Sequence, residues 1–239
     1  MPSRILLFTS DFVAVDKAPG VSLQTSRRRP GAGLHRLLLS LAAPERALLE
    51  AEPDLRLVHR LDRGTSGLVL LARGEEAHRR LSEGFARGWL HREYLGIVWG
   101  RWPEERRLVA VPLGPDEEDR RRMRPVAGGK PARTAVEVLA ATPRASLLRF
   151  LPLTGRTHQI RIHAAASGHP LCGDDLYGTL RDLPPGVSPA LRQALPARPL
   201  LHAHRLLLPQ GEPAPPVDLT APPPEDFLEA LALLALPPP

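Results

Sequence analysis

The sequence predicts an α+β protein organised around a mixed sheet. Segments with strand patterning outnumber segments with helical patterning, and the two kinds do not alternate as a doubly wound fold requires. No repeat period is visible along the chain. The chain has 239 residues, of which 43% are hydrophobic and 24% are charged, ordinary values for a soluble globular protein. This length accommodates one large domain or two small ones.

Short apolar runs bounded by turn residues predict the strands of this sheet. In chain order they lie at residues 5–8, 12–16, 57–62, 68–72, 91–99, 133–141, 146–151 and 200–208. Apolar residues at helical spacing predict helices over 33–43 and 75–87. A helix over 157–168 is expected to end at a glycine followed by Pro170, and a run of prolines precedes a last helix over 224–236.

Three stretches are expected to be loops, because Arg, Pro and Gly dominate them. They lie near residues 22–33, 101–132 and 179–199. The second contains an acidic-then-basic run over 116–124, which is typical of a solvated loop or arm.

The formal net charge of +6 points to a polyanionic partner such as RNA. Lys17 and Lys130 are the only lysines, and coding composition also produces such an arginine bias, so the charge alone supports RNA only moderately. A single cysteine, Cys172, excludes an internal disulfide and a cysteine zinc site. No signal peptide or membrane-spanning run is visible, so we expect a cytoplasmic protein without membrane contact.

The most informative stretch is Val58-His59-Arg60-Leu61-Asp62-Arg63-Gly64-Thr65-Ser66-Gly67. If it begins as a strand, Arg60 and Asp62 share one face while Leu61 points into the core. The neighbouring cation would keep the carboxylate ionised. The alternative is a strand that ends in a polar turn with one surface ion pair.

A second block runs from Leu153 to His163, with the sequence LTGRTHQIRIH, and a third from Gly168 to Gly178, GHPLCGDDLYG. Thr157 is a plausible N-cap for the helix there. Metal binding by His158 and His163 is a weak hypothesis, because five-residue spacing puts them on different helix faces. Asp174 and Asp175 are expected to stabilise a turn after Gly173, and the alternative is a second pair of catalytic carboxylates.

These motifs closely resemble those of the RluA-type RNA pseudouridine synthases. HRLDRGTSGLVLLAR resembles the catalytic motif of that family, and His59 separates it from the sister RsuA-type enzymes, which have glycine there. The segments around Tyr94 and from 153 to 178 resemble further family motifs in the expected order. The resemblance covers residues from about 11 to 208, and departs from the usual pattern at Gly64 and Arg73.

The resemblance implies the pseudouridine synthase fold, a long, mostly antiparallel mixed sheet with flanking helices and a central catalytic cleft. It implies action on ribosomal or transfer RNA without cofactor or metal. Because the resemblance to the catalytic domain already begins at residue 11, we expect one catalytic domain over 1–239, without the separate N-terminal RNA-binding domain that many relatives carry, and a monomer by default. Asp62 would be the catalytic carboxylate, Arg161 its partner, and Tyr94 the residue that stacks on the flipped base. The substrate-binding candidates are His59, Arg60, Thr65, Arg156, His158 and Gln159.

Two alternatives remain at this point. One is a catalytically silent RNA-binding or ribosome-assembly factor on the same fold. The other is a hydrolytic glycosidase that releases free uracil. Phosphate-binding-loop and nucleophile-elbow patterns are both missing from the sequence.

Overall fold

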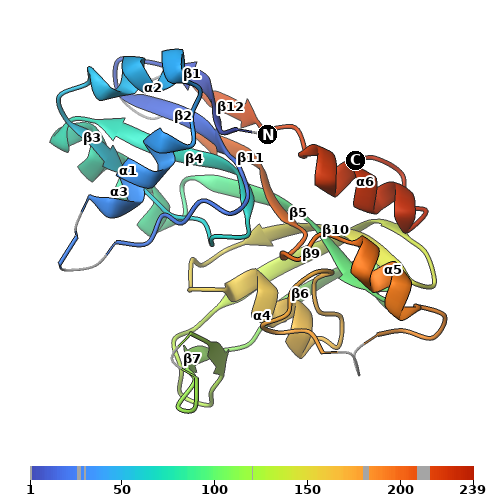
Figure 1. Ribbon diagram of the computed structural model, residues 1–239. Coiled ribbons are helices and arrows are strands. Elements are labelled where there is room, and N and C mark those ends of the chain that lie inside the picture. The colour runs from blue at the N-terminus through green and yellow to red at the C-terminus, as the bar shows by residue number, and fades with distance from the viewer. Residues whose placement is uncertain (1, 26–27, 30, 120, 180–182, 209–215) are drawn as a thin grey trace. The chain divides into compact units, whose positions relative to one another are not determined.

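A computed structural model describes residues 2–25, 28–29, 31–119, 121–179, 183–208 and 216–239. Strands and helices follow one another without regular alternation, which confirms the expected α+β class (Figure 1). The chain forms two compact units. The first comprises Met1–Arg92 and Ala203–Pro224, and the second comprises Glu93–His202 and Glu225–Pro239. Parts of the expected loops, at 26–27, 30, 120 and 180–182, lie outside the described residues.

The first unit is built on a sheet whose central strand is buried and almost wholly apolar. Its strands are β1 (Arg4–Phe8), β2 (Phe12–Lys17), β3 (Leu55–Leu57), β4 (Ser66–Arg73), β11 (Leu201–Leu208) and β12 (Val217–Thr220). The order is β1-β2-β4-β11, with β3 also paired to β4 and β12 to β11. Strand β2 pairs along one edge of β4. Strands β3 and β11 share the other edge, and β3 pairs with the end of β4 that contains Arg73. All residues of β4 except Arg73 are buried, so both of its faces are covered, and a strand buried on both faces reads as a continuous hydrophobic run.

The helices of the first unit are α1 (Ala32–Leu39), α2 (Ala43–Glu50) and α3 (Glu75–Arg87). The helix expected over 33–43 is confirmed as α1, but it ends at Leu39 instead of residue 43, and the separate helix α2 was not expected. Ser40 is held by a 2.7 Å hydrogen bond from its hydroxyl to that of Ser3, and α2 then starts with Pro44 in its first turn. Pro44 is a recognisable helix-start signal that the apolar periodicity missed. The bounds expected for α3 are confirmed.

The second unit contains an antiparallel sheet in the order β5-β10-β9-β6. Its strands are β5 (His91–Trp99), β6 (Arg106–Ala110), β9 (Arg133–Ala141) and β10 (Ala145–Pro152), beside a hairpin of β7 (Leu113–Pro115) and β8 (Met123–Pro125). The expectation of a loop throughout 101–132 is wrong. Strand β6 pairs with β9, and the charged run forms only the tip of the β7–β8 hairpin.

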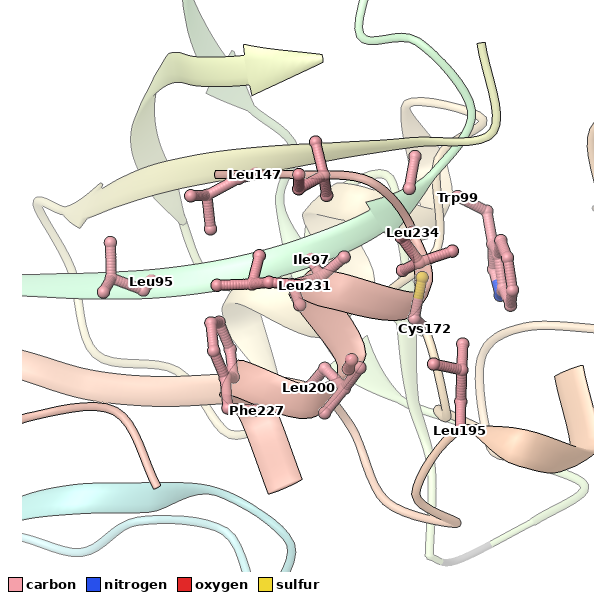
Figure 2. Packing of buried hydrophobic residues seen from close by; sticks show 13 residues of the cluster. Leu95, Ile97, Trp99, Leu147, Cys172, Leu195, Leu200, Phe227, Leu231 and Leu234 are labelled. Carbon is pink, nitrogen blue, oxygen red and sulfur yellow. The ribbon is translucent and has the colours of Figure 1, made fainter. Parts of the chain in front are cut away.

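The core of the second unit forms where one face of its sheet meets the C-terminal helix, as Figure 2 shows. The unit's helices are α4 (Gln159–Ala166), α5 (Pro189–Ala194) and α6 (Glu225–Leu233). Phe227 and Leu231 of α6 are buried against Leu95, Ile97 and their neighbours. Each such side chain contributes about 1.5–3 kcal/mol on burial, which explains why this short helix is stable. The segment 179–199, expected to be irregular, contains α5.

Within the described residues, no helix is both long enough and apolar enough to cross a bilayer.

Candidate active site

The loop that carries Asp62 leaves the first sheet where the side chain of His59, instead of a main-chain carbonyl, accepts a hydrogen bond from β4. Strand β3 ends at Leu57, and the N–H of Val58 still donates to the carbonyl of Leu70 at 3.1 Å. The N–H of Leu70, however, donates to Nε2 of His59, also at 3.1 Å. The strand expected over 57–62 is therefore wrong from Val58 onward. Arg60 and Asp62 lie outside the strand, so the prediction that they share one face of it is wrong.

His59 must be neutral to fill this role, because its Nε2 accepts a hydrogen bond. Burial, together with the charge of Arg92, lowers the pKa of His59 to about 3. The imidazole also packs on the Phe85 ring, with the two ring centroids 4.5 Å apart. Through these contacts His59 fixes the start of the loop, directly after β3. Its predicted contact with substrate stays a prediction.

A buried lysine holds the other side of the loop. Nζ of Lys17 donates to the carbonyls of Ala18 at 2.9 Å, Val21 at 3.2 Å and Arg63 at 3.4 Å. The N–H of Gly20 also donates to the Arg63 carbonyl, at 2.8 Å. A compact ammonium with three donors fits this cluster of carbonyls better than a planar guanidinium. This explains a lysine in a chain where almost every other basic residue is arginine.

The far end of the loop is fixed by Gly67, which has φ +104° and faces β11 closely. A Cβ at this position would lie 2.2 Å from the carbonyl oxygen of Ala203. Only glycine permits both the backbone angle and the approach. The turn before it is closed by a 3.1 Å hydrogen bond from the N–H of Thr65 to the carbonyl of Asp62. Asp62 thus lies on a short loop that is anchored at both ends.

The predicted site residues of this loop differ in exposure. Arg60 is exposed and Asp62 is half-buried, whereas Thr65 is buried. Among the described residues, the Thr65 hydroxyl finds no hydrogen-bond partner. A buried hydroxyl without a partner is uncommon, and in a candidate site it suggests a role toward a ligand.

In the second unit, Arg161 is held rigidly by Asp174. Its Nε donates to Oδ2 at 2.7 Å and its Nη2 to Oδ1 at 2.8 Å, a bidentate pair. The two side chains are 9% and 1% exposed. The guanidinium also lies over the ring of Tyr177, with Cζ 5.0 Å from the centroid. Such a pair fixes both the position and the direction of the arginine.

Asp174 and Tyr177 also organise the surrounding turn. Oδ1 of Asp174 accepts the N–H groups of Leu176 and Tyr177, so the expected turn-stabilising role is confirmed for Asp174. The Tyr177 hydroxyl accepts the N–H of Met123 at 2.9 Å and lies 2.8 Å from Nδ1 of His158. This tyrosine therefore links the β8 strand to the start of α4.

Helix α4 begins differently from the sequence expectation. His158, not Thr157, is the N-cap, and it adopts a left-handed conformation with φ 57° and makes no side-chain cap. Non-glycine residues in this conformation are uncommon and are concentrated at functional sites. The hydrogen bond between Nδ1 and the Tyr177 hydroxyl supports this conformation.

Gln159 has all its amide hydrogen-bonding capacity used inside the protein. Its Oε1 accepts from the Thr154 hydroxyl and the Arg156 N–H, and its Nε2 donates to the Arg133 carbonyl and the Thr134 hydroxyl. Four good partners saturate a glutamine amide. The contact with RNA predicted for Gln159 would require these bonds to open. Arg156, by contrast, is exposed, with Nε donating to the Pro131 carbonyl.

Tyr94 is buried on β5, opposite Phe150 of β10. The first unit thus holds His59, Arg60, Asp62 and Thr65, and the second unit holds the remaining predicted residues. Those are Tyr94, Arg156, His158, Gln159 and Arg161. The sequence did not reveal the supporting roles of Lys17 and Tyr177. The rarity of lysine was the available signal for the first, and the motif around Asp174 for the second.

Two of the arginines at the tip of the β7–β8 hairpin that the structure describes are paired with neighbouring acids. Arg121 contacts Asp119 at 2.7 Å and Arg124 contacts Glu117 at 3.3 Å. Residues 116–124 contain equal numbers of acidic and basic side chains. The tip is therefore close to neutral, and basic charge for a polyanion has to come mainly from other surfaces.

Three kinds of comparison with known proteins all find RNA pseudouridine synthases. A family model described as RNA pseudouridylate synthase matches residues 11–166, a range that contains every site residue predicted from the sequence. An uncharacterized RNA pseudouridine synthase of Zymomonas mobilis is 36% identical over 232 residues, covering 96% of this chain and 97% of that protein.

Two ribosomal enzymes are also similar. The ribosomal large subunit pseudouridine synthase C of Haemophilus ducreyi is 36% identical over 179 residues, or 74% of this chain. Synthase D of Nitrosomonas europaea is 36% identical over 209 residues, or 87% of this chain. The matches cover only 54% and 58% of those two proteins, so this chain spans little more than half their length.

Solved structures share the fold. Human RNA Pseudouridylate Synthase Domain Containing 4 superimposes with a TM-score of 0.76 at 24% identity, covering 98% of this chain and 94% of that chain. For Human RNA Pseudouridylate Synthase Domain Containing 1 the TM-score is 0.70 at 26% identity, with 99% and 96% covered.

Proposed function

Because this chain belongs to the RNA pseudouridylate synthase family, we propose that it is an isomerase that converts specific uridines of structured RNA into pseudouridine. The observation that carries the proposal is the family match over residues 11–166, together with a relative that aligns over 96% of the chain. Two of the similar proteins are named as ribosomal large subunit enzymes, so ribosomal RNA is the first substrate to test, with transfer RNA second.

The proposed reaction is an internal rearrangement. The N1–C1′ bond of the uridine breaks, the base turns over, and a bond forms between C5 and C1′. The proton lost from C5 balances the proton gained at N1, so the reaction consumes no oxidant, metal or cofactor. The target base has to leave its stack first, at a cost on the order of a few kcal/mol.

We assign the chemistry to Asp62, acting either by attack on C1′ or by removal of a ribose proton. The hydrogen bonds of His59, Lys17 and Gly20 support this assignment, since they anchor the loop that carries the carboxylate. Catalytic groups work best on a support that does not reorganise during reaction.

Arg161 and Tyr94 have separate proposed roles in the same reaction. Arg161 would keep the carboxylate charged and oriented, and its bidentate contact with Asp174 supports a rigid guanidinium. Tyr94 would stack on the flipped base. The exposed Arg60 and Arg156 would bind phosphate, which makes affinity dependent on salt.

The test is pseudouridine formation on ribosomal and transfer RNA from cells that lack this protein. Asp62→Asn removes the charge with little change of shape, and Asp175→Asn is the control, since that carboxylate is exposed and paired with Arg192. We expect conversion by the wild type and the control, and none by Asp62→Asn. The modified uridine is detected by chemical derivatisation and primer extension.

Each alternative has its own signature in this assay. Tight RNA binding without any conversion would overturn the enzymatic proposal in favour of a silent binding or assembly factor. Free uracil, detected by chromatography, would identify a hydrolase. Retained activity in Asp62→Asn would contradict the role of the carboxylate. We further propose a cytoplasmic monomer, which fractionation of cells and size-exclusion chromatography would check.

A further inference from the structure

The chain leaves helix α3 through a turn that fixes the next residues firmly. Gly88 is left-handed, with φ 73°, and its N–H donates to the carbonyl of Phe85 at 3.3 Å. The N–H of Trp89 donates to the carbonyl of Gly84 at 2.9 Å. These two bonds form a Schellman motif, a rigid way to end a helix. The backbone of Trp89 is therefore held in place.

The side chain of Trp89 nevertheless points to solvent. In a Schellman motif, the residue at this position usually packs on the side chain where Gly84 stands. Here that space is filled by Leu90, whose Cδ1 and Cγ would lie 3.3 Å from a Cβ at Gly84. As a result Trp89 is 53% exposed, whereas the other two tryptophans, Trp99 and Trp102, are 4% and 3% exposed.

The exposed indole has basic surroundings. The guanidinium of Arg87 lies over the ring, with Cζ 4.9 Å from the ring centroid, and also pairs with Glu83 at 2.6 Å. His91, two residues after Trp89, is exposed. No acidic residue occurs from Arg87 to Arg92. An arginine stacked on an exposed ring holds the ring in one orientation. The Glu83 carboxylate offsets part of the Arg87 charge.

We propose that this corner, formed by Arg87, Trp89 and His91, binds RNA by stacking an unpaired base on the indole of Trp89. The partner class rests on the proposed function, and the corner is an additional contact outside the predicted active-site residues. A base can cover the exposed face of the indole, while Arg87 and His91 contact the adjacent phosphates. Base–aromatic stacking tolerates any sequence, because every base has a π-face.

Charge distinguishes RNA from a protein partner at this corner. A protein-docking surface needs a continuous apolar patch, but the neighbouring Leu90 is buried, and the exposed side chains of Arg87 and His91, two residues to either side of Trp89, are basic. Aromatic residues interleaved with arginine are typical of surfaces that bind single-stranded nucleic acid. The aromatic content of the chain is only 4%, so few other rings are available for such a role.

Fluorescence tests the contact directly, because Trp89 is the exposed tryptophan and the other two are buried. Oligoadenylate of about ten nucleotides is the probe, since it lacks uridine and cannot be a substrate. We expect oligoadenylate to quench the emission of the wild-type chain and not that of Trp89→Phe. Quenching that persists unchanged in Trp89→Phe would overturn the proposal, and so would no quenching at low salt.

Binding constants provide a second, independent measurement. Trp89→Ala should weaken oligoadenylate binding about tenfold, the effect of one lost base–aromatic stack, while Trp89→Phe should retain most of the affinity. The matched control is Leu39→Ala, because Leu39 is equally exposed at 53% in the same unit. Affinity of Trp89→Ala within twofold of wild type would contradict the contact. Neither measurement requires turnover. A chain that forms no pseudouridine could therefore still show this contact, and a chain that lacks the contact could still form pseudouridine.

Discussion

The buried pair of Arg161 and Asp174 allows a sharp test of how the second unit supports its catalytic candidate. Asp174→Asn keeps the shape of the side chain and an oxygen that can accept the N–H groups of Leu176 and Tyr177. It removes the charge that Arg161 faces at 2.7 Å and replaces one of the two acceptor oxygens by a donor, so one hydrogen bond of the bidentate pair is lost as well. Because both side chains are less than a tenth exposed, solvent cannot replace the lost partner.

Breaking one partner of a buried ion pair costs about 3–5 kcal/mol, since the other charge stays buried without compensation. At about 2–4 °C per kcal/mol for a chain of this size, a loss near 3 kcal/mol would lower the melting temperature by about 6–12 °C. Arg161→Met should cost a similar amount. The double variant, with both charges gone, should recover most of the stability, because a pair replaced by uncharged groups is often neutral.

The assay is urea unfolding of the wild type, both single variants and the double variant, followed by circular dichroism. The stability recovered in the double variant measures the coupling between the two residues. Pseudouridine formation is measured in parallel, and we expect the double variant to be folded yet inactive. The reasoning is refuted if Asp174→Asn unfolds within 1 kcal/mol of the wild type, a threshold of about one ordinary hydrogen bond.

Three other expectations concern the loop of Asp62. Lys17→Arg should destabilise the protein by about 2–4 kcal/mol in urea, because a guanidinium overfills the fully buried site; the exposed control Lys130→Arg should change stability by less than about 0.5 kcal/mol. Thr65→Val should raise stability by about 1 kcal/mol, because the buried hydroxyl lacks a partner; it should weaken RNA binding in a titration, and unchanged affinity would exclude the predicted contact. The folded-state pKa of His59 is about 3, so its contribution to stability is complete above the unfolded pKa near 6.5. As the pH falls from 6.5 toward 3, this contribution should decline by about 1.4 kcal/mol per pH unit, and urea unfolding against pH should show a smaller slope in His59→Gln; equal slopes would contradict a neutral, buried His59.

The sequence predicted the main strands of both units and missed shorter elements in each. The bounds of α3 and the strands β5, β9 and β10 agree with the apolar patterns, because period-two and period-four spacing reports directly which face is buried. The misses have local causes. Strand β6 was missed because it begins with Arg106 and Arg107 in a segment rich in charge and proline, and α2 was missed because the first helix ends at Leu39.

For the candidate site, too, the sequence predicted some features and only the structure showed others. Resemblance to the motifs of a known family singled out Asp62, Tyr94 and Arg161 as candidates, because the types and order of these residues can be read from the chain itself. It could not show that His59 ends strand β3 by taking the N–H of Leu70, since that bond joins residues eleven apart through a side chain. Nor could it show that Asp174, thirteen residues after Arg161, is the bidentate partner.

By itself, the sequence determined the α+β class and most of the strands, since these follow from local pattern, and its resemblance to a family supplied the candidate site residues. The tertiary structure alone decided which groups hold those residues in place. Hydrogen bonds and ion pairs between distant residues depend on distances of a few tenths of an ångström, which no residue pattern encodes. For that reason Lys17, Asp174 and Tyr177 gained their roles only in the fold, as did Trp89, whose exposure depends on Leu90 filling the space above Gly84.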